Sequence, residues 1–115
     1  MQYQKIIILF LLVLLSSNSF ADKKIKMGVT WGYTASGFFS PEIDELMVKK
    51  VLANSPAEQA GLKVGDKVLS VEGCDIPGCS ASKAKAYLKS DSGTELHFVI
   101  ENNKGEIVNI VITVG

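Results

Sequence analysis

Two cysteines and a single histidine are the side chains of this sequence with the widest range of possible chemistry. Cys74 and Cys79 have four residues between them, and His97 is the one histidine. A dithiol redox motif has two residues between its cysteines, and a zinc site needs more thiolate or imidazole ligands than this chain supplies. Pro77 and Gly78 favour a turn that would bring the cysteines together. The pattern therefore favours a structural disulfide between Cys74 and Cys79, and it predicts no metal site.

The sequence offers no group of side chains spaced for catalysis. A serine hydrolase needs a histidine oriented as its base, and no serine stands in a Gly-x-Ser-x-Gly setting. Cysteine catalysis would need a free thiol, which the expected disulfide consumes. Glu95 and Glu101 are six residues apart on one predicted strand, and we interpret them as its solvated face. We therefore predict no enzymatic activity and no cofactor.

The first 21 residues are typical of a secretory signal. Lys5 supplies positive charge, residues 6–15 are an unbroken apolar run, and residues 19–21 (Ser-Phe-Ala) place small side chains where a signal peptidase inspects them. The alternative is an uncleaved membrane anchor, but ten apolar residues are fewer than the ~20 that a spanning helix needs. We expect cleavage after Ala21, which leaves residues 22–115 as one domain, periplasmic or secreted, with no membrane anchor.

The expected mature domain has nearly balanced charge. All 12 basic residues of the chain are lysines, and the loss of Lys5 leaves 11 of them against 12 acidic residues, a net charge of −1. Proteins that bind nucleic acid carry a basic stripe that usually contains arginine, so the composition gives no support to that function. The cysteine pair fits an oxidising compartment, where disulfides persist.

The elements that must position these residues follow from apolar periodicity and turn residues. Residues 34–44 are expected to be irregular, because they contain Gly37, Pro41 and the aromatic pair at 38–39. The remaining order gives a mixed α+β chain that is mostly antiparallel. The predicted strands are residues 25–33, 46–52, 67–72, 95–101 and 108–114, and the predicted helices are residues 55–62 and 82–89.

The short helix has the clearest local signal. Ser55 is a good N-cap, and Pro56 fits the first helical position, where no N–H group is needed. Glu58 stands three residues after Ser55 and can complete a capping box. Gly61 can adopt the left-handed conformation that ends a helix. The apolar residues that must be buried for so short a helix to be stable are Ala57, Ala60 and Leu62.

Residues 55–73 strongly resemble a PDZ domain. In that family a Ser-Pro-Ala…Ala-Gly-Leu…Gly-Asp…Val-x-Gly run covers a short helix and the strand after it. The run Ser-Pro-Ala-Glu-Gln-Ala-Gly-Leu-Lys-Val-Gly-Asp-Lys-Val-Leu-Ser-Val-Glu-Gly matches it in register over 19 residues. The expected element order fits the family from residue 25 to residue 114, with the last strand from the C-terminus as in the bacterial periplasmic variant. The resemblance implies a small PDZ-like, partly open antiparallel β-barrel or sandwich capped by two helices.

The resemblance also implies peptide binding. PDZ domains take an extended peptide as an added strand at an open sheet edge, and backbone N–H groups of a loop hold its terminal carboxylate. That loop falls on residues 26–29, where a lysine stands in place of the family's first glycine, and the binding edge falls on residues 29–33. The implied peptide-binding residues are Lys26, Met27, Gly28, Val29, Thr30 and Trp31 on the loop and edge, with Ala81, Lys85 and Leu88 on the facing helix.

Several of these residues have a plainer interpretation. Met27, Val29 and Leu88 could be core residues alone, because apolar alternation usually marks a buried face. Trp31 could line the groove or pack against the aromatic pair at 38–39. Ala81 stands where some family members carry a histidine, which implies a preference for an apolar ligand side chain.

The function expected from these observations is an exported module that captures C-termini or extended segments of other exported proteins or peptides by β-strand addition. The alternative is a structural or assembly domain, in which residues 34–41 block the groove or edge strands pair between copies. The two differ in whether the edge at residues 29–33 is accessible.

Overall fold

The computed structural model describes residues 26–115. The expected signal segment lies outside these residues, so cleavage after Ala21 stays a prediction. No helix in residues 26–115 is long and apolar enough to cross a membrane. The elements described are β1 (Val29–Ser36), β2 (Glu42–Val51), α2 (Pro56–Ala60), β3 (Lys67–Val71), β4 (Cys74–Asp75), α3 (Ala81–Leu88), β5 (Glu95–Glu101) and β6 (Ile107–Thr113).

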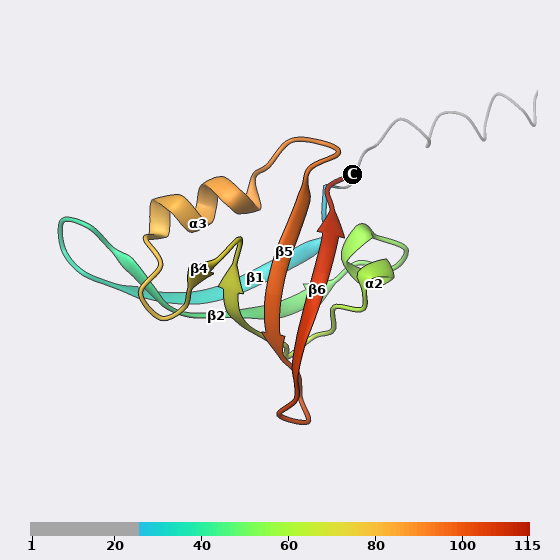
Figure 1. Cartoon of the computed structure of the whole chain (residues 1–115), viewed down its shortest axis with the longest axis horizontal. Coiled ribbons are helices and arrows are strands. Elements are labelled where there is room, and N and C mark those ends of the chain that lie inside the picture. The colour runs from blue at the N-terminus through green and yellow to red at the C-terminus, as the bar shows by residue number, and fades with distance from the viewer. Residues whose placement is uncertain (1–25) are drawn as a thin grey trace, which may run out of the picture.

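The strands form one antiparallel sheet in the order β1-β2-β3-β5-β6, and the short strand β4 pairs with β3. The sheet passes from β2 to β3 at the pair Met47–Lys67, and the β1–β2 hairpin runs across the direction of β5 and β6 (Figure 1). The sheet does not close into a barrel, because β1 and β6 are its two edges. The predicted antiparallel fold with two helices is confirmed, and the expected partly open barrel or sandwich is here a sheet that stays open.

The hydrophobic core is centred on alternate residues of β5. Leu96, Phe98 and Ile100 are almost completely buried, whereas Glu95 before them and His97 between them are exposed. Burial of a side chain of this size contributes about 1.5–3 kcal/mol relative to its exposure. Other fully buried side chains are Val48, Val68, Val71 and Ile112.

The short helix α2 has the predicted ends. The Ser55 hydroxyl accepts a hydrogen bond from the Glu58 N–H at 3.2 Å and donates one to the Leu52 carbonyl at 2.7 Å. Gly61 ends the helix with a φ of 97°, in the left-handed region. In a capping box the Glu58 carboxylate would accept from the N–H of Ser55. Here it accepts instead from the N–H of Asn54, one residue before the N-cap, at 2.7 Å.

The β1–β2 hairpin is longer than predicted. Both ends of the segment expected to be irregular, residues 34–44, are paired strand residues. That expectation was wrong because contacts across the hairpin set the pairing: Ile43 is buried in the core, and the Ser36 hydroxyl donates to the Asp44 carboxylate at 2.9 Å. The irregular segment is therefore reduced to the turn at residues 37–41.

The predicted disulfide between Cys74 and Cys79 is present, with 5.4 Å between the two Cα atoms. The loop that it closes leads from β4 towards α3 and is fixed to β2. The Ile43 N–H donates to the Cys79 carbonyl at 2.7 Å, and the Gly78 N–H donates to the Ile43 carbonyl at 3.0 Å. The disulfide loop thus helps to set the position from which α3 starts.

Replacing Ser55 with alanine should lower the free energy of unfolding by about 1–2 kcal/mol, because the hydroxyl is buried and makes two hydrogen bonds. Denaturant unfolding followed by far-UV circular dichroism measures the change. Ser92→Ala, at an exposed serine before β5, is the matched control and should change stability by less than about 0.5 kcal/mol. Equal losses in the two variants would contradict the capping role.

Reduction of the Cys74–Cys79 disulfide should lower the free energy of unfolding by about 2 kcal/mol at most, because short loops gain least from closure. The protein should stay folded, because only Ile76 and Cys79 of this loop are buried in the core. Unfolding curves with and without reductant, together with a Cys74→Ser/Cys79→Ser variant, measure this. Complete loss of the folded state on mild reduction would show the expectation to be wrong.

Candidate functional site

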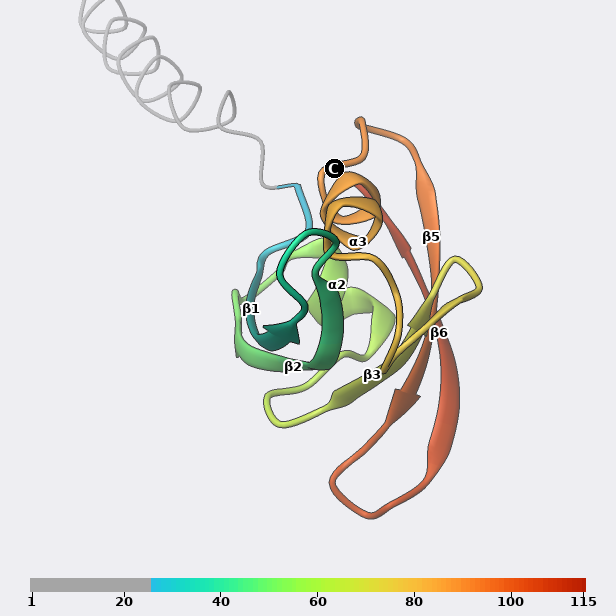
Figure 2. The same ribbon diagram turned by 90° about the vertical axis from the view of Figure 1, so that its left-hand side faces the viewer.

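A groove of about 360 Å³ lies between the β1–β2 hairpin and α3, which runs alongside that hairpin (Figures 1 and 2). Exposed lysines, Lys26, Lys85 and Lys89, form part of its lining, and among residues 26–115 no acidic residue does. The rest of the lining is apolar or aromatic: Met27, Val29, Trp31, Tyr33, Ile43, Leu46, Ala84 and Leu88.

The structure brings most of the expected peptide-binding residues to this groove. Gly28 and Thr30 do not line it, and Thr30 is exposed. Ala81 packs against the core instead, because its N–H donates to the Pro41 carbonyl at 2.9 Å and holds the first turn of α3 against the start of β2. Ala84, one turn later, is the alanine of α3 that lines the groove. The expected residues that do line it are Lys26, Met27, Val29, Trp31, Lys85 and Leu88.

Several lining residues were not expected from the sequence. Ile43 fell within the segment predicted to be irregular, so the alternation that places it on the groove side of β2 was missed. The position of Lys89 could have been predicted, because it stands four residues after the expected groove residue Lys85 and residues with this spacing share one side of a helix. Tyr33 belongs to the expected binding edge, and the lining residues outside the expected set are Ile43, Leu46, Ala84 and Lys89.

β1 is an edge strand beside this groove. It pairs with β2 from Val29 to Ser36, and among the described strands it has no other partner. An unpaired strand edge presents free backbone N–H and C=O groups to another chain. The sequence analysis did not decide whether the edge at residues 29–33 is accessible. In the described part of the chain this edge has no strand paired to it.

The segment before β1 is held by backbone hydrogen bonds to three separate parts of the chain. The carbonyls of residues 26, 27 and 28 accept from the N–H groups of Gly115, Ala57 and Leu52, at 2.7, 3.0 and 2.8 Å respectively. Gly28 has a φ of 80°, a left-handed conformation that glycine adopts without strain, and it sets the bend from which β1 starts.

The same bend leaves backbone donors at one end of the groove. Within residues 26–115, the N–H groups of Met27 and Gly28 donate to no carbonyl. Lys26 and Met27 both line the groove, so these donors lie next to a lysine and an apolar surface.

Trp31 joins the groove to the core. Its ring lines the groove and stacks on Phe98, with the ring centroids 5.8 Å apart and an interplanar angle of 24°. The aromatic pair at residues 38–39 contacts itself at the tip of the hairpin, with centroids 4.9 Å apart. No residue of the segment 34–41 lines the groove. The groove is therefore not covered by its own hairpin tip.

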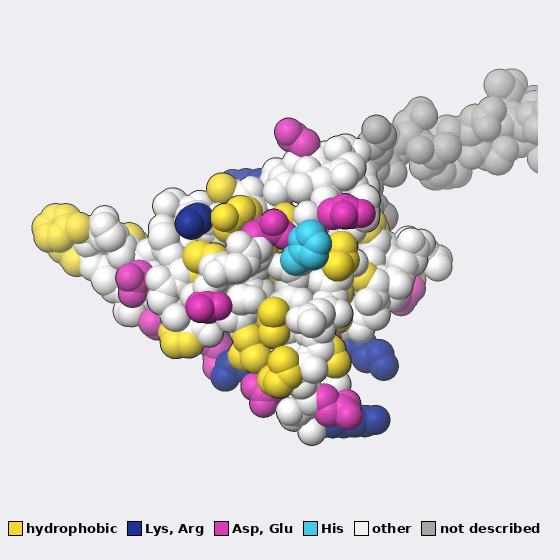
Figure 3. Space-filling model, viewed as in Figure 1, with side chains coloured by type: hydrophobic (Ala, Val, Ile, Leu, Met, Phe, Trp, Pro, Cys, Tyr) yellow, Lys and Arg dark blue, Asp and Glu magenta, His cyan; other side chains and the backbone are white. Residues whose placement is uncertain are grey.

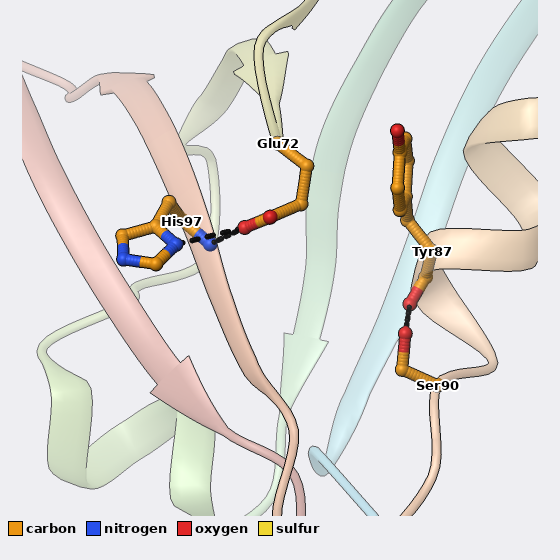
Figure 4. Close-up of polar contacts among 4 residues, drawn as sticks. All are labelled: Glu72, Tyr87, Ser90 and His97. Carbon is orange, nitrogen blue, oxygen red and sulfur yellow. Dashed lines mark hydrogen bonds and ion pairs between the residues drawn. The ribbon is translucent and has the colours of Figure 1, made fainter.

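A polar pair outside the groove ties the turn after β3 to β5. The Glu72 carboxylate lies 2.8 Å from Nδ1 of His97 (Figure 4). It also accepts from the His97 backbone N–H, and this bond, followed by the ring contact, lowers the pKa of Glu72 from its ordinary value of 4.5. Figure 4 also shows the Ser90 hydroxyl donating to the Tyr87 carbonyl at the end of α3. Within residues 26–115, no cluster of three or more His, Cys, Asp or Glu side chains could hold a metal ion.

Comparison with known proteins gives one family and several partial relatives. A family model described as "PDZ domain" matches residues 47–102. Syntenin-2 of Rattus norvegicus is 40% identical over 57 residues, which are 50% of this chain and 19% of syntenin-2. A carboxyl-terminal-processing protease of Picosynechococcus sp. is 31% identical over 72 residues, which are 63% of this chain and 17% of the protease. The chain thus spans less than a fifth of either relative.

Solved structures share the fold over most of the chain. The HtrA3 PDZ domain bound to a phage-derived ligand has a TM-score of 0.55 at 20% identity, covering 81% of this chain and 86% of that one. The photosystem II D1 C-terminal processing protease has a TM-score of 0.56 at 20% identity, covering 86% of this chain and 26% of that one. At this level of identity, the likeness shows the fold.

The stabilising effect of Glu72 should disappear at low pH. Because the folded state lowers its pKa below 4.5, the carboxylate contributes fully above that pH and the contribution is lost as the pH falls through the lowered value. The difference in unfolding free energy between the wild type and Glu72→Gln should therefore persist down to about pH 5 and shrink below about pH 4. Urea unfolding at each pH measures it.

His97→Ala provides the control for this titration. It removes the ring contact but keeps the backbone N–H that donates to Glu72, so part of the pH dependence should persist. A wild-type and Glu72→Gln difference that is independent of pH would contradict the assignment.

Proposed function

The chain belongs to the PDZ domain family, and on that premise we propose that it binds C-termini or extended segments of partner proteins by β-strand addition at the free edge of β1. PDZ domains bind peptides in this way. The observation that carries the proposal is the unpaired edge of β1 beside an apolar groove.

A peptide laid along β1 would become a further strand of the sheet. Its backbone would pair with the free N–H and C=O groups of the edge, which gives affinity that depends little on sequence. Val29, Trp31 and Tyr33 line the groove at alternate positions of β1. Alternate side chains of the peptide would therefore enter an apolar groove, which favours apolar ligand residues at those positions.

A terminal carboxylate would fit the end of the groove at residues 26–28. The N–H groups of Met27 and Gly28 have no carbonyl partner within the described residues, and Lys26 and Lys89 add positive charge to the lining. Hydrogen bonds from N–H groups to a carboxylate are stronger than those between neutral groups. Lys26 stands where the family has glycine, and in this proposal its charge supplements the backbone donors.

The proposed compartment is the periplasm or the cell exterior. The Cys74–Cys79 disulfide supports it, because disulfides persist where the surroundings are oxidising. With the expected signal removed, residues 22–115 would be one PDZ domain, and its partners would be other exported proteins. In this proposal the domain acts through the chains that it holds, with no catalysis of its own.

Leu88→Glu should weaken peptide binding by at least about tenfold, because it places a carboxylate among apolar groove residues and repels a terminal carboxylate. Peptides selected from a library of free C-termini, titrated by fluorescence polarisation, measure this. The same peptides with an amidated C-terminus should also bind the wild type more weakly.

The matched control is Val111→Glu, which places the same charge at a half-exposed valine of β6 outside the groove. It should leave peptide affinity unchanged. The proposal fails if the library yields no binding peptide, or if Leu88→Glu and Val111→Glu bind equally well.

A further inference from the structure

The least explained surface feature is the aromatic pair at the tip of the β1–β2 hairpin. Phe38 and Phe39 are 90% and 92% exposed and pack edge to face. Figure 3 shows hydrophobic side chains gathered at the end of the molecule, where the turn of this hairpin projects in Figure 1. Large apolar side chains gathered on a surface mark an interaction site, and the groove-binding role makes no use of them.

The base of the turn that carries the tip is held in place by backbone hydrogen bonds. Pairing of the hairpin continues to Ser36 and Glu42, immediately beside the turn. The Pro41 carbonyl accepts from the Ala81 N–H, and Glu42 forms a β-bridge with Ser80. The base of the turn is therefore fixed to the start of α3. A contact that is already ordered loses less conformational freedom on binding than a flexible loop would lose.

The hairpin segment that carries the tip has acidic residues and no lysine along residues 27–48. The acids are Glu42, Asp44 and Glu45. Glu42 and Asp44 are exposed, while Glu45 is paired with Lys67 at 3.8 Å. Acidic side chains behind an apolar tip oppose approach to an anionic membrane surface. They favour a partner that offers an apolar site with basic residues around it.

The groove of the same molecule has these properties. It offers an apolar and aromatic surface that includes Trp31 and Leu88. Among the described residues, the charged side chains that line it are lysines, with no acid. The tip and the groove are therefore complementary in both polarity and charge. The tip cannot fill the groove of its own chain in this fold, because no residue from 34 to 41 lines that groove.

We propose that the Phe38–Phe39 tip of one copy docks into the β1–α3 groove of a second copy. The proposal rests on the groove binding polypeptide, as argued above, and it names an occupant. The contact joins two different surfaces, the tip of one copy and the groove of the next. An open assembly of any length therefore keeps one free tip at one end and one free groove at the other. Such a contact either closes into a ring or continues head to tail. A peptide ligand and a neighbouring tip would compete for the same groove.

Sedimentation and light scattering of the purified chain test this. The apparent mass of the wild type should rise with concentration, and added salt should oppose the rise because the contact pairs opposite charges. Phe38→Ser/Phe39→Ser should stay monomeric. Ile107→Ser/Val111→Ser removes two exposed apolar residues from β6 and should associate as the wild type does.

Mixing two deficient variants gives the sharper test. Phe38→Ser/Phe39→Ser keeps its groove, and Leu88→Glu keeps its tip, so neither should self-associate. Their mixture should form a 1:1 dimer that grows no further, because only one working contact remains. A non-specific loss of solubility or folding would not restore association in the mixture.

A wild type that is monomeric up to about 1 mM, or a mixture of the two variants that stays monomeric, would overturn the inference. Binding of monomeric wild type to phosphatidylcholine vesicles that is lost in Phe38→Ser/Phe39→Ser would assign the tip to a membrane and overturn it too. The proposed peptide binding is judged separately with the tip variant, whose groove has no competitor. If that variant binds peptides while the wild type does not self-associate, only this inference is lost.

Discussion

Three hydrogen bonds to the carbonyls of residues 26–28 determine where β1 begins, and the groove depends on that position. They come from Gly115 beyond β6, from α2 and from the residue after β2, so parts of the chain far apart in sequence meet at one bend. The carbonyls of the bend are used within the fold, while the N–H groups of Met27 and Gly28 are not used by any carbonyl of the described residues. The same contacts that anchor β1 therefore leave these two N–H groups available for the carboxylate of the proposed ligand.

An open strand edge usually carries a cost, since it invites unselective pairing with other chains. Here α3 lies beside the edge, and lysines stand among the lining residues. A strand bound as proposed would therefore have to fit between β1 and the helix and tolerate positive charge. Trp31 links this requirement to the core, because its ring stacks on Phe98 while it lines the groove. The shape of the groove is in this way held by packing between the groove wall and the core.

The elements with local signals could be predicted from the sequence, and those that depend on distant partners could not. The cap at Ser55, the left-handed Gly61 and the alternation along β5 are encoded within a few residues, and the structure has all three. The paired ends of residues 34–44 depend on contacts across the hairpin. The face of α3 was also ambiguous, because alanines occur on several of its sides and do not distinguish inward from outward. As a result Ala81 was placed in the groove, where Ala84 lies instead.

Placing the two proposed binding surfaces on one hairpin has a thermodynamic consequence. β1 supplies the free edge of the groove, and the turn that follows it carries the exposed phenylalanines. If a peptide and a neighbouring tip exclude each other from the groove, each must weaken the apparent affinity of the other by the same coupling free energy. Assembly would then respond to the supply of ligand, and ligand capture to the concentration of the protein. No conformational change is needed for this coupling, since occupancy of one shared groove is sufficient.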